Sequence, residues 1–420
     1  MTELCAQVGY QNVRIAQVTS RAKVSTATFY EQFADKEGCM LAAYAAVAEH
    51  VFGQLGETSD ASDWSAAARG ALEPLLAALV SHPDAGRLLF IEGTPSGQRL
   101  RAQRRQAIGG FERRVQGFLD SPPKDGNTLD LPATAVVGAL RSIVANHLHS
   151  HTEDLLTSLI DDGLAWVASY AVPATQALWS TGPRAILPQA PEPGPRPHIQ
   201  LPVLLPPGRH APSAGALARS QRERILAGTA GVTMAKGYAA TTVADIVARA
   251  RVSRESFYEH FSNKQHAFLE AQQYPTQCVL DACARAYFSV RAWPERIWTG
   301  LKTLLHLIAA NPAFSHLRLV ECYAAGPLAA HRAEEITRSF TFFLEEGYTH
   351  RPGASQLPRL CSAAIVGAIF ALIQRHVAHE QIEDLPRRLP QIAYVAIAPF
   401  TGPNYAIDLL QRLSSRLTYT

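Results

Sequence analysis

The chain has few of the features that mark membrane, secreted or metal-binding proteins. It holds only six cysteines, none in a CxxC pair, so neither a disulfide framework nor a thiolate metal site is indicated. No apolar run reaches the ~18 residues that a membrane span needs. The start, MTELCAQVGYQ, has no basic segment followed by an apolar run, which speaks against a secretory signal. We therefore predict a cytoplasmic protein without membrane contact.

Signatures of catalysis are also missing. We find no nucleophile elbow, no phosphate-cradling glycine loop and no HExxH. His147, His149 and His151 are spaced by two, so a helix would not bring them to one face for a metal. We predict that the protein is not an enzyme and has no metal or cofactor. The formal net charge is only +3, so any surface for nucleic acid must be local.

What the sequence does contain is a repeat. Gly9–Ala43 aligns without a gap on Gly237–Ala271, and 14 of the 35 positions are identical, where chance gives roughly two or three. Further matches, such as Trp64 with Trp293, extend along the chain with a shift that drifts only from 228 to 230. The whole half is therefore duplicated, which makes one polypeptide the equivalent of a dimer.

The periodicity of both copies is helical. Leu72, Leu75, Leu76 and Leu79 fall at i, i+3, i+4 and i+7, and no convincing period-two run occurs. We predict an all-α fold. Eleven prolines lie within 171–218, and proline at that density predicts an extended linker. The final helix pairs, near 133–170 and 362–400, are predicted to pack together as a four-helix interface.

The second copy contains a pattern typical of a helix-turn-helix. Thr242 and Asp245 predict a capping box at the start of one helix, and Ser253 predicts an N-cap for the next. Phe257 and Phe261, four apart, are predicted to face the core. The outward side of that second helix then carries groups that can enter a major groove: Arg254, Ser256, Tyr258 and His260.

These residues resemble the DNA-binding region of the TetR/AcrR family of bacterial transcription regulators. The shared features are KGY, T-V-x-x-I, V-S, F-Y-x-x-F and a following lysine, and the first copy keeps GY, V-S, FYEQF and Lys36. The resemblance implies two fused units, each with a three-helix DNA-binding domain and a helical ligand-binding and dimerisation domain. The implied domains are 1–43 and 44–170, then the linker 171–218, then 219–271 and 272–420.

The resemblance also implies which residues contact DNA. They are Thr242, Arg251, Ser253, Arg254, Ser256, Tyr258, His260 and Lys264 in the second copy, and Arg14, Lys23, Ser25, Thr26, Thr28, Tyr30 and Lys36 in the first. The family usually has glycine before V-S, in a left-handed turn. Lys23 and Arg251 stand there instead, either as extra charge near DNA or as solvated turn residues.

The two copies are unequal. Segment 219–264 has eight basic and four acidic residues, whereas segment 1–43 has four of each. Met1 aligns with Thr229, so the counterparts of Ile225 and Leu226 are missing, either because the true start lies upstream or because this copy is weakened. Arg14 and Gln17 replace the capping pair. We predict that the second copy binds DNA more tightly.

For a small-molecule effector of unknown identity, aromatic and polar residues of each bundle are candidates: Phe90, Glu92, Phe111 and His147 in the first, and Phe314, Glu321, Tyr323, Phe343 and His376 in the second. A structural role in the core is the alternative for each of them. The predicted function is a ligand-responsive repressor that binds a double-stranded DNA operator as an intramolecular pseudo-dimer with non-identical half-sites. Further homo-oligomerisation is left open. The alternative is a ligand- or protein-interaction module with weak or lost DNA binding.

Overall fold

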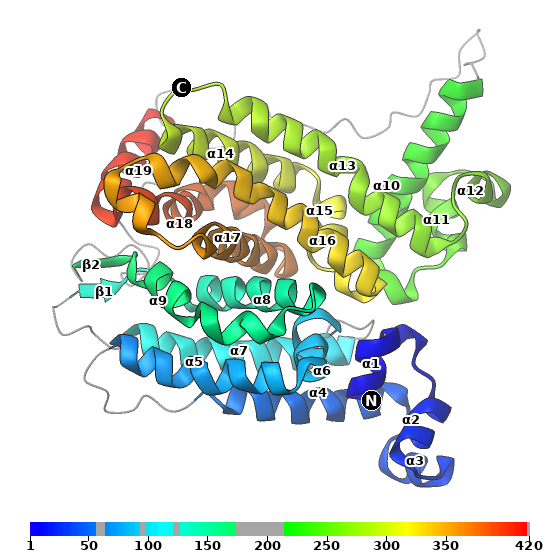
Figure 1. The fold of residues 1–420 in the computed structure, drawn as a ribbon. Coiled ribbons are helices and arrows are strands. Elements are labelled where there is room, and N and C mark those ends of the chain that lie inside the picture. Colours follow the sequence, from blue (N-terminus) through cyan, green and yellow to red (C-terminus); the bar gives the residue numbers. More distant parts are fainter. Residues whose placement is uncertain (56–63, 93–97, 121–126, 174–213, 418–420) are drawn as a thin grey trace.

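The computed structural model describes residues 1–55, 64–92, 98–120, 127–173 and 214–417. These residues are almost entirely helical, as predicted, and they form two halves that lie against each other (Figure 1). Each half begins with a small cluster of short helices, here called a head, and continues into a bundle of longer ones. Both heads lie at the same end of the molecule (Figure 1).

The first half begins with head 1, residues 2–43, which includes the first turns of its first long helix, and continues into its bundle. Its elements are α1 (Thr2–Val8), η1 (Tyr10–Asn12), α2 (Ile15–Ala22), α3 (Thr26–Gln32), α4 (Lys36–Gly53), α5 (Trp64–Ser81), α6 (Pro83–Gly86), η2 (Arg87–Glu92), α7 (Gln98–Asp120), β1 (Asn127–Leu129), α8 (Ala133–His149), η3 (Glu153–Leu159), α9 (Ile160–Ala168) and β2 (Ala171–Pro173).

The second half begins with head 2, residues 214–271, and likewise continues into a helical bundle. Its elements are α10 (Ala214–Ala240), α11 (Val243–Ala250), α12 (Arg254–His260), α13 (Lys264–Tyr287), α14 (Trp293–Ala310), α15 (Pro312–Leu319), η5 (Cys322–Ala325), α16 (Pro327–Ser339), η6 (Phe340–Thr349), η7 (Pro352–Gln356), α17 (Leu360–Ala378), η8 (Ile382–Arg388), α18 (Leu389–Thr401) and α19 (Pro403–Leu417). The bounds of α11 and α12 equal those of α2 and α3 shifted by the same 228 residues that relate the sequences.

The predicted linker is shorter than its sequence suggested. Its first residues, Ala171–Pro173, form strand β2, which pairs antiparallel with β1 in the register Thr128 with Val172. Its last residues already belong to α10, which begins at Ala214. The intervening part, 174–213, lies outside the described residues. The two short strands are also a small exception to the prediction that the chain has no strands.

The halves meet where the sequence predicted, with α8 packed along α17 and with α9 and α18 beside them (Figure 1). The two long helices approach closely at a glycine in each. A Cβ on Gly138 would lie 2.1 Å from the Cβ of Ala371, and one on Gly367 would lie 2.7 Å from the Cβ of Ser142. These glycines occupy equivalent positions in the repeats AVVGAL and AIVGAI. The contact is therefore built around a pair of repeat-related positions.

The largest apolar core runs across this junction and includes residues of both halves. The buried Tyr170 at the end of the first half donates its hydroxyl hydrogen bond to the carbonyl of Val395 in the second, at 2.7 Å. Burying large apolar side chains from both halves together makes their association part of the fold itself.

One helix among the described residues, α17, is long and apolar enough to pass a composition test for a membrane span. Most of that stretch is buried inside the protein, where α17 packs on α8 and α18. An internal core helix meets the same test.

Candidate nucleic-acid interface and effector cavities

The turn of each helix-turn-helix has the left-handed backbone that the sequence predicted. Lys23 has φ 55° and ψ 40°, and Arg251 has φ 53° and ψ 50°. Left-handed backbone is unfavourable for residues with a Cβ. Both side chains are exposed, so each turn carries a positive charge on the surface of its head.

The caps of head 2 form as predicted. The Thr242 hydroxyl accepts the N–H of Asp245, and the Asp245 carboxylate accepts the N–H of Thr242 at 2.9 Å. Lys236 pairs with the same carboxylate at 2.5 Å. The hydrogen bonds from Lys236 and Thr242 lower the pKa of Asp245 to about 2. The carboxylate therefore stays ionised at any physiological pH and keeps α11 anchored.

Head 1, in which Arg14 and Gln17 replace the capping pair, keeps one half of a capping box. The side-chain oxygen of Gln17 accepts the N–H of Arg14 at 2.8 Å, which is one of the two bonds of a capping box. The other bond is absent because the arginine side chain has no acceptor atom. Both second helices are capped alike, because the Ser25 and Ser253 hydroxyls each accept an N–H at 3.0 Å.

The aromatic pair that sets the roll of the second helix is buried in head 2. Phe257 and Phe261 are 0% and 1% exposed, with ring centroids 5.8 Å apart. In head 1 Phe29 is buried, but Phe33 is only partly covered. The recognition helix is thus held more firmly in head 2 than in head 1.

Not all of the α12 residues predicted to face outward are exposed. Arg254 is exposed, and its guanidinium lies 5.8 Å from the centroid of the exposed Tyr258 ring. Ser256, by contrast, is half-buried and accepts a hydrogen bond from the Gln221 side chain at 3.3 Å. His260 is half-buried as well, and its Nε2 is shielded from solvent. The prediction that Ser256 and His260 face the groove is therefore not supported. In head 1, Thr26, Thr28 and Tyr30 are exposed.

The two lysines predicted to grip the DNA backbone hold their own heads together. The ammonium of Lys264 donates to the carbonyls of Tyr238, Ala239 and Thr241 at 2.9–3.2 Å and lies 4.6 Å from the centre of the Tyr238 ring. Lys36 is bonded in the same way to carbonyls of Tyr10 and Val13. Burial lowers the pKa of both lysines. Their donors are occupied inside the protein, which corrects their assignment as phosphate contacts.

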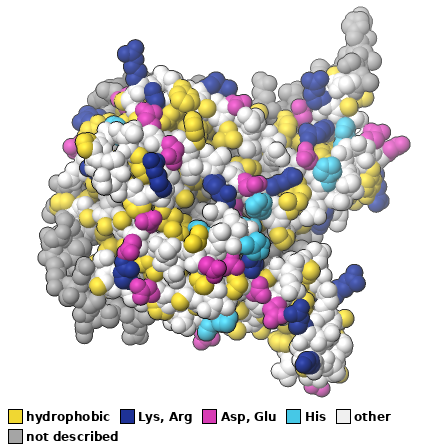
Figure 2. Space-filling model, viewed as in Figure 1, with side chains coloured by type: hydrophobic (Ala, Val, Ile, Leu, Met, Phe, Trp, Pro, Cys, Tyr) yellow, Lys and Arg dark blue, Asp and Glu magenta, His cyan; other side chains and the backbone are white. Residues whose placement is uncertain are grey.

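The basic side chains left on the surface differ between the heads. In head 1, Arg21 is paired with Glu3 at 2.5 Å, and Arg14 and Lys23 are exposed. In head 2, Arg219, Arg249, Arg251 and Arg254 are all exposed. The heads project as separate lobes from one side of the molecule (Figure 2). Head 2 therefore exposes more basic side chains than head 1.

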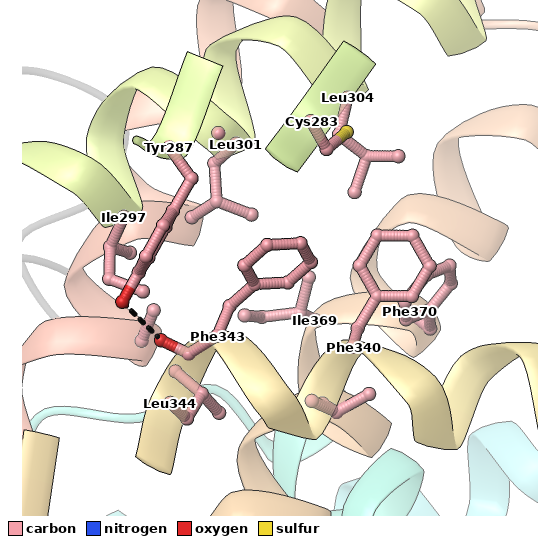
Figure 3. A pocket seen from close by; sticks show the side chains of 13 residues that line it. Cys283, Tyr287, Ile297, Leu301, Leu304, Phe340, Phe343, Leu344, Ile369 and Phe370 are labelled. Atoms are coloured by element: carbon pink, nitrogen blue, oxygen red, sulfur yellow. Dashed lines mark hydrogen bonds between the residues drawn. The ribbon is translucent and has the colours of Figure 1, made fainter. Parts of the chain in front are cut away.

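The effector candidates divide between cavities. Phe343 lines a cavity of ≈ 50 Å³ and points into it beside Phe340, while its backbone carbonyl accepts the Tyr287 hydroxyl at 3.2 Å (Figure 3). Phe314 lines another cavity of ≈ 50 Å³, and Tyr323 lines one of ≈ 40 Å³. Phe90 and Phe111 line a much larger one of ≈ 290 Å³.

Three other candidates have structural roles. His147 is hydrogen-bonded through Nδ1 to the Thr152 hydroxyl at 2.9 Å, and His376 to the carbonyl of Leu372 at 2.9 Å. Glu321, 1% exposed, pairs with Arg101 and accepts the N–H of Tyr238 at 2.8 Å. The side chain of Glu92 lies outside the described residues. Sequence patterns do not single out the arginines of the large cavity, because an arginine on a helix is most often a solvated residue.

Comparison with known proteins agrees with this geometry. The family described as "Bacterial regulatory proteins, tetR family" matches residues 2–43 and 225–271, which cover the two helix-turn-helix segments. No curated protein matches the chain. A solved TetR-like transcriptional regulator from Rhodococcus sp. RHA1 is 17% identical, covering 49% of this chain and 97% of its own, with a TM-score of 0.32.

Two helix-turn-helix heads on helical bundles define a DNA-binding regulator. The segment that the tetR family model describes occurs twice in this chain, once in each head.

Proposed function

We propose that this chain is a ligand-responsive repressor that binds one operator as an intramolecular pseudo-dimer with two different half-sites. The observation that carries the proposal is the junction of α8 and α17 around Gly138 and Gly367, which occupy equivalent positions in the two repeats. In dimeric helix-turn-helix proteins, the second helix of each motif, here called the reading helix, enters one of two successive major grooves. In this chain the reading helices are α3 and α12. Both heads lie at one end of this chain (Figure 1), which supports the proposal that one chain presents two such helices to the same operator.

Non-identical half-sites follow from the reading helices. At equivalent positions, α3 exposes Thr26 and α12 exposes Arg254. An arginine pairs well with guanine in the major groove, whereas threonine contacts are weaker and less selective. Footprinting of the full chain on its operator should reveal an asymmetric site, with stronger protection on the half bound by head 2. A perfect inverted repeat, protected equally on both sides, would contradict the proposal.

Sedimentation of the complex with operator DNA tests the pseudo-dimer directly. One chain per operator is expected, because the covalent link keeps the second head at high effective concentration. Two chains per operator, with one head of each on DNA, would exclude the pseudo-dimer.

The alternative function is an interaction module that no longer binds DNA. It is favoured by head 1, with its balanced charge and its Arg21–Glu3 pair. Binding to promoter DNA at two salt concentrations separates the functions. A regulator should lose affinity steeply as salt rises, because phosphate contacts release counterions. A chain that shows no binding at low salt would leave the interaction module as the explanation.

A further inference from the structure

The largest of the cavities described above lies between the two halves. Its volume is ≈ 290 Å³, and its lining comes from α4, η2, α7 and α8 of the first half and from Val320, α17 and His379 of the second. One part of the lining is apolar and includes Phe52, Leu89, Phe90, Phe111 and Val137. Another part is mostly cationic and includes Arg101, Arg104, Arg105, Arg141 and Arg375, together with one carboxylate, Glu112, which is paired with Arg375 at 3.3 Å. A ligand with an apolar body and an anionic end would match both parts of the lining.

Two of these arginines are poorly neutralised. Arg104 and Arg141 both lie against the ring of Tyr323, at 5.5 and 5.6 Å from its centroid. Arg141 donates to the Tyr323 hydroxyl at 3.4 Å and to the Gln374 side chain at 2.9 Å, both neutral acceptors. The Nε of Arg104 is shielded from solvent without a hydrogen-bond partner. Within the described part of the chain, no carboxylate forms an ion pair with either residue.

Such a pair of cations is costly when no anion is present. Burial and the neighbouring charge of Arg141 lower the pKa of Arg104. A guanidinium taken from water needs a charged partner or a full set of acceptors. A carboxylate or phosphate bound against both would supply them through short, charge-assisted hydrogen bonds.

We propose that this cavity binds an amphipathic anion, a carboxylate or phosphate with an apolar body, whose charged end lies against Arg104 and Arg141. The biological meaning rests on the proposed ligand-responsive regulation, whereas the binding site itself does not. A neighbouring cavity also includes Arg141, but its volume is only ≈ 40 Å³ and the carboxylate of Glu334 lines it. One anion per chain is therefore expected.

The same cavity is connected to head 2. Arg101, one turn before Arg104 on α7, also lines the cavity and forms an ion pair with the buried Glu321. The other oxygen of that carboxylate accepts the N–H of Tyr238 at 2.8 Å. Tyr238 follows Gly237, whose φ of 79° interrupts α10 just before the reading helices. An anion beside Arg101 competes with Glu321 for its charge and so loosens the hold on this kink. A ligand held by arginines of the first half would thus act on the head of the second.

Calorimetric titration of the full chain without DNA tests the site. The probes are octanoate and octyl phosphate, with 1-octanol as the uncharged match. We expect the two anions to bind once per chain and octanol to bind at least tenfold more weakly. Arg104→Gln and Arg141→Gln should each weaken anion binding at least tenfold, and Arg104→Lys should weaken it less. Arg113→Gln, at an exposed position of α7 outside the cavity, is the matched control. Equal binding of octanol, unchanged affinity in Arg104→Gln, or no saturable anion binding would overturn the proposal.

A melting temperature that stays level or rises would show that Arg104→Gln does not lose binding through misfolding. This is the expected result, since the variant removes a half-buried charge that has no ion-pair partner among the described residues. The connection to head 2 is tested by hydrogen exchange. Octanoate should speed exchange of amides around Tyr238 in the wild type but not in Glu321→Gln, which keeps an acceptor for the N–H and loses the charge. Unchanged exchange in the wild type would overturn the connection. Neither readout uses DNA, so failure here is distinguishable from failure of the proposed function.

Discussion

The two heads share a backbone plan and differ in what they present to DNA. Their reading helices have equivalent bounds, the same serine N-cap, the same left-handed turn and the same internal lysine bonded to carbonyls. Head 2 adds a full capping box, a completely buried aromatic pair and exposed arginines, which head 1 lacks or has in part. The backbone features of the helix-turn-helix are therefore the same in both heads, whereas the exposed side chains differ. The residues that fold a head can thus be told apart from those proposed to contact DNA.

The largest effect on stability is expected at the junction of α8 and α17, where the two halves are joined and the heads are thereby held together. Gly138→Ala places a Cβ 2.1 Å from that of Ala371, so overpacking should cost about 2–3 kcal/mol of unfolding free energy. Gly163→Ala is the matched control, since no atom lies within 4 Å of the added Cβ. It should be neutral or stabilise α9 by up to about 1 kcal/mol. Urea denaturation of both variants measures the difference, and equal midpoints would contradict close packing at Gly138.

The next prediction separates the heads by DNA affinity. Arg254→Ala should weaken operator binding by about 1–3 kcal/mol, because an exposed arginine on a reading helix is suited to guanine. Thr26→Ala, at the equivalent position of head 1, should have a much smaller effect. Fluorescence anisotropy with labelled operator gives both affinities. A larger loss for Thr26→Ala would reverse the order of the heads.

The lysines test whether the shared frame is structural. Lys264→Met removes donors from three backbone carbonyls, which should destabilise the protein by about 1–3 kcal/mol. The salt dependence of DNA binding should stay unchanged, since the ammonium is not free for phosphate. Arg249→Met, which removes an exposed charge of head 2, should instead lower the salt slope if that side chain contacts phosphate. A lower slope for Lys264→Met would restore its assignment as a DNA contact.

A smaller change should make head 1 more like head 2. Arg14→Thr supplies the missing hydroxyl opposite Gln17, which already accepts the Arg14 N–H. We expect a gain of about 0.5–1 kcal/mol from the completed box. Thr242→Ala should cost a similar amount in head 2. Thermal unfolding of both variants measures these changes in stability. No gain in Arg14→Thr would mean that the single hydrogen bond of Gln17 already stabilises the helix as much as a complete capping box.

The smallest effect concerns pH at the junction. His149 of α8 lies 2.9 Å from Glu334 of α16. Burial alone would lower the pKa of His149, but the hydrogen bond and charge of Glu334 outweigh it and raise the pKa above 6.5. The pair therefore stabilises the folded chain fully below pH 6.5, and this contribution is lost as pH rises through the raised pKa. His149→Gln should remove that part of the pH dependence. Unfolding at pH 6 and pH 9 tests it, and an unchanged difference in the variant would contradict the assignment.

Much of each head could be read from the sequence because its determinants are local. The cap residues Thr242 and Ser253 and the spacing of Phe257 and Phe261 act within one or two turns, so pattern alone located both reading helices. The same reasoning failed for Lys264, Ser256 and His260. The partners of Lys264 and Ser256 lie on α10 or directly after it, and His260 is half-buried, so an outward position on a helix does not by itself make a side chain free.

The bundles show the opposite balance. Spacing predicted their helices and the meeting of α8 with α17, but it chose His147, Glu321 and His376 as effector contacts and passed over Arg104 and Arg141. The sequence by itself determined that the chain is a duplicated, all-helical protein with two helix-turn-helix heads, because helix periodicity and caps are encoded in neighbouring residues. Only the tertiary structure decided which charged side chains are paired inside the fold and which lack a charged partner. That depends on contacts between residues as far apart as Arg101, Tyr238 and Glu321, and no local pattern records such contacts.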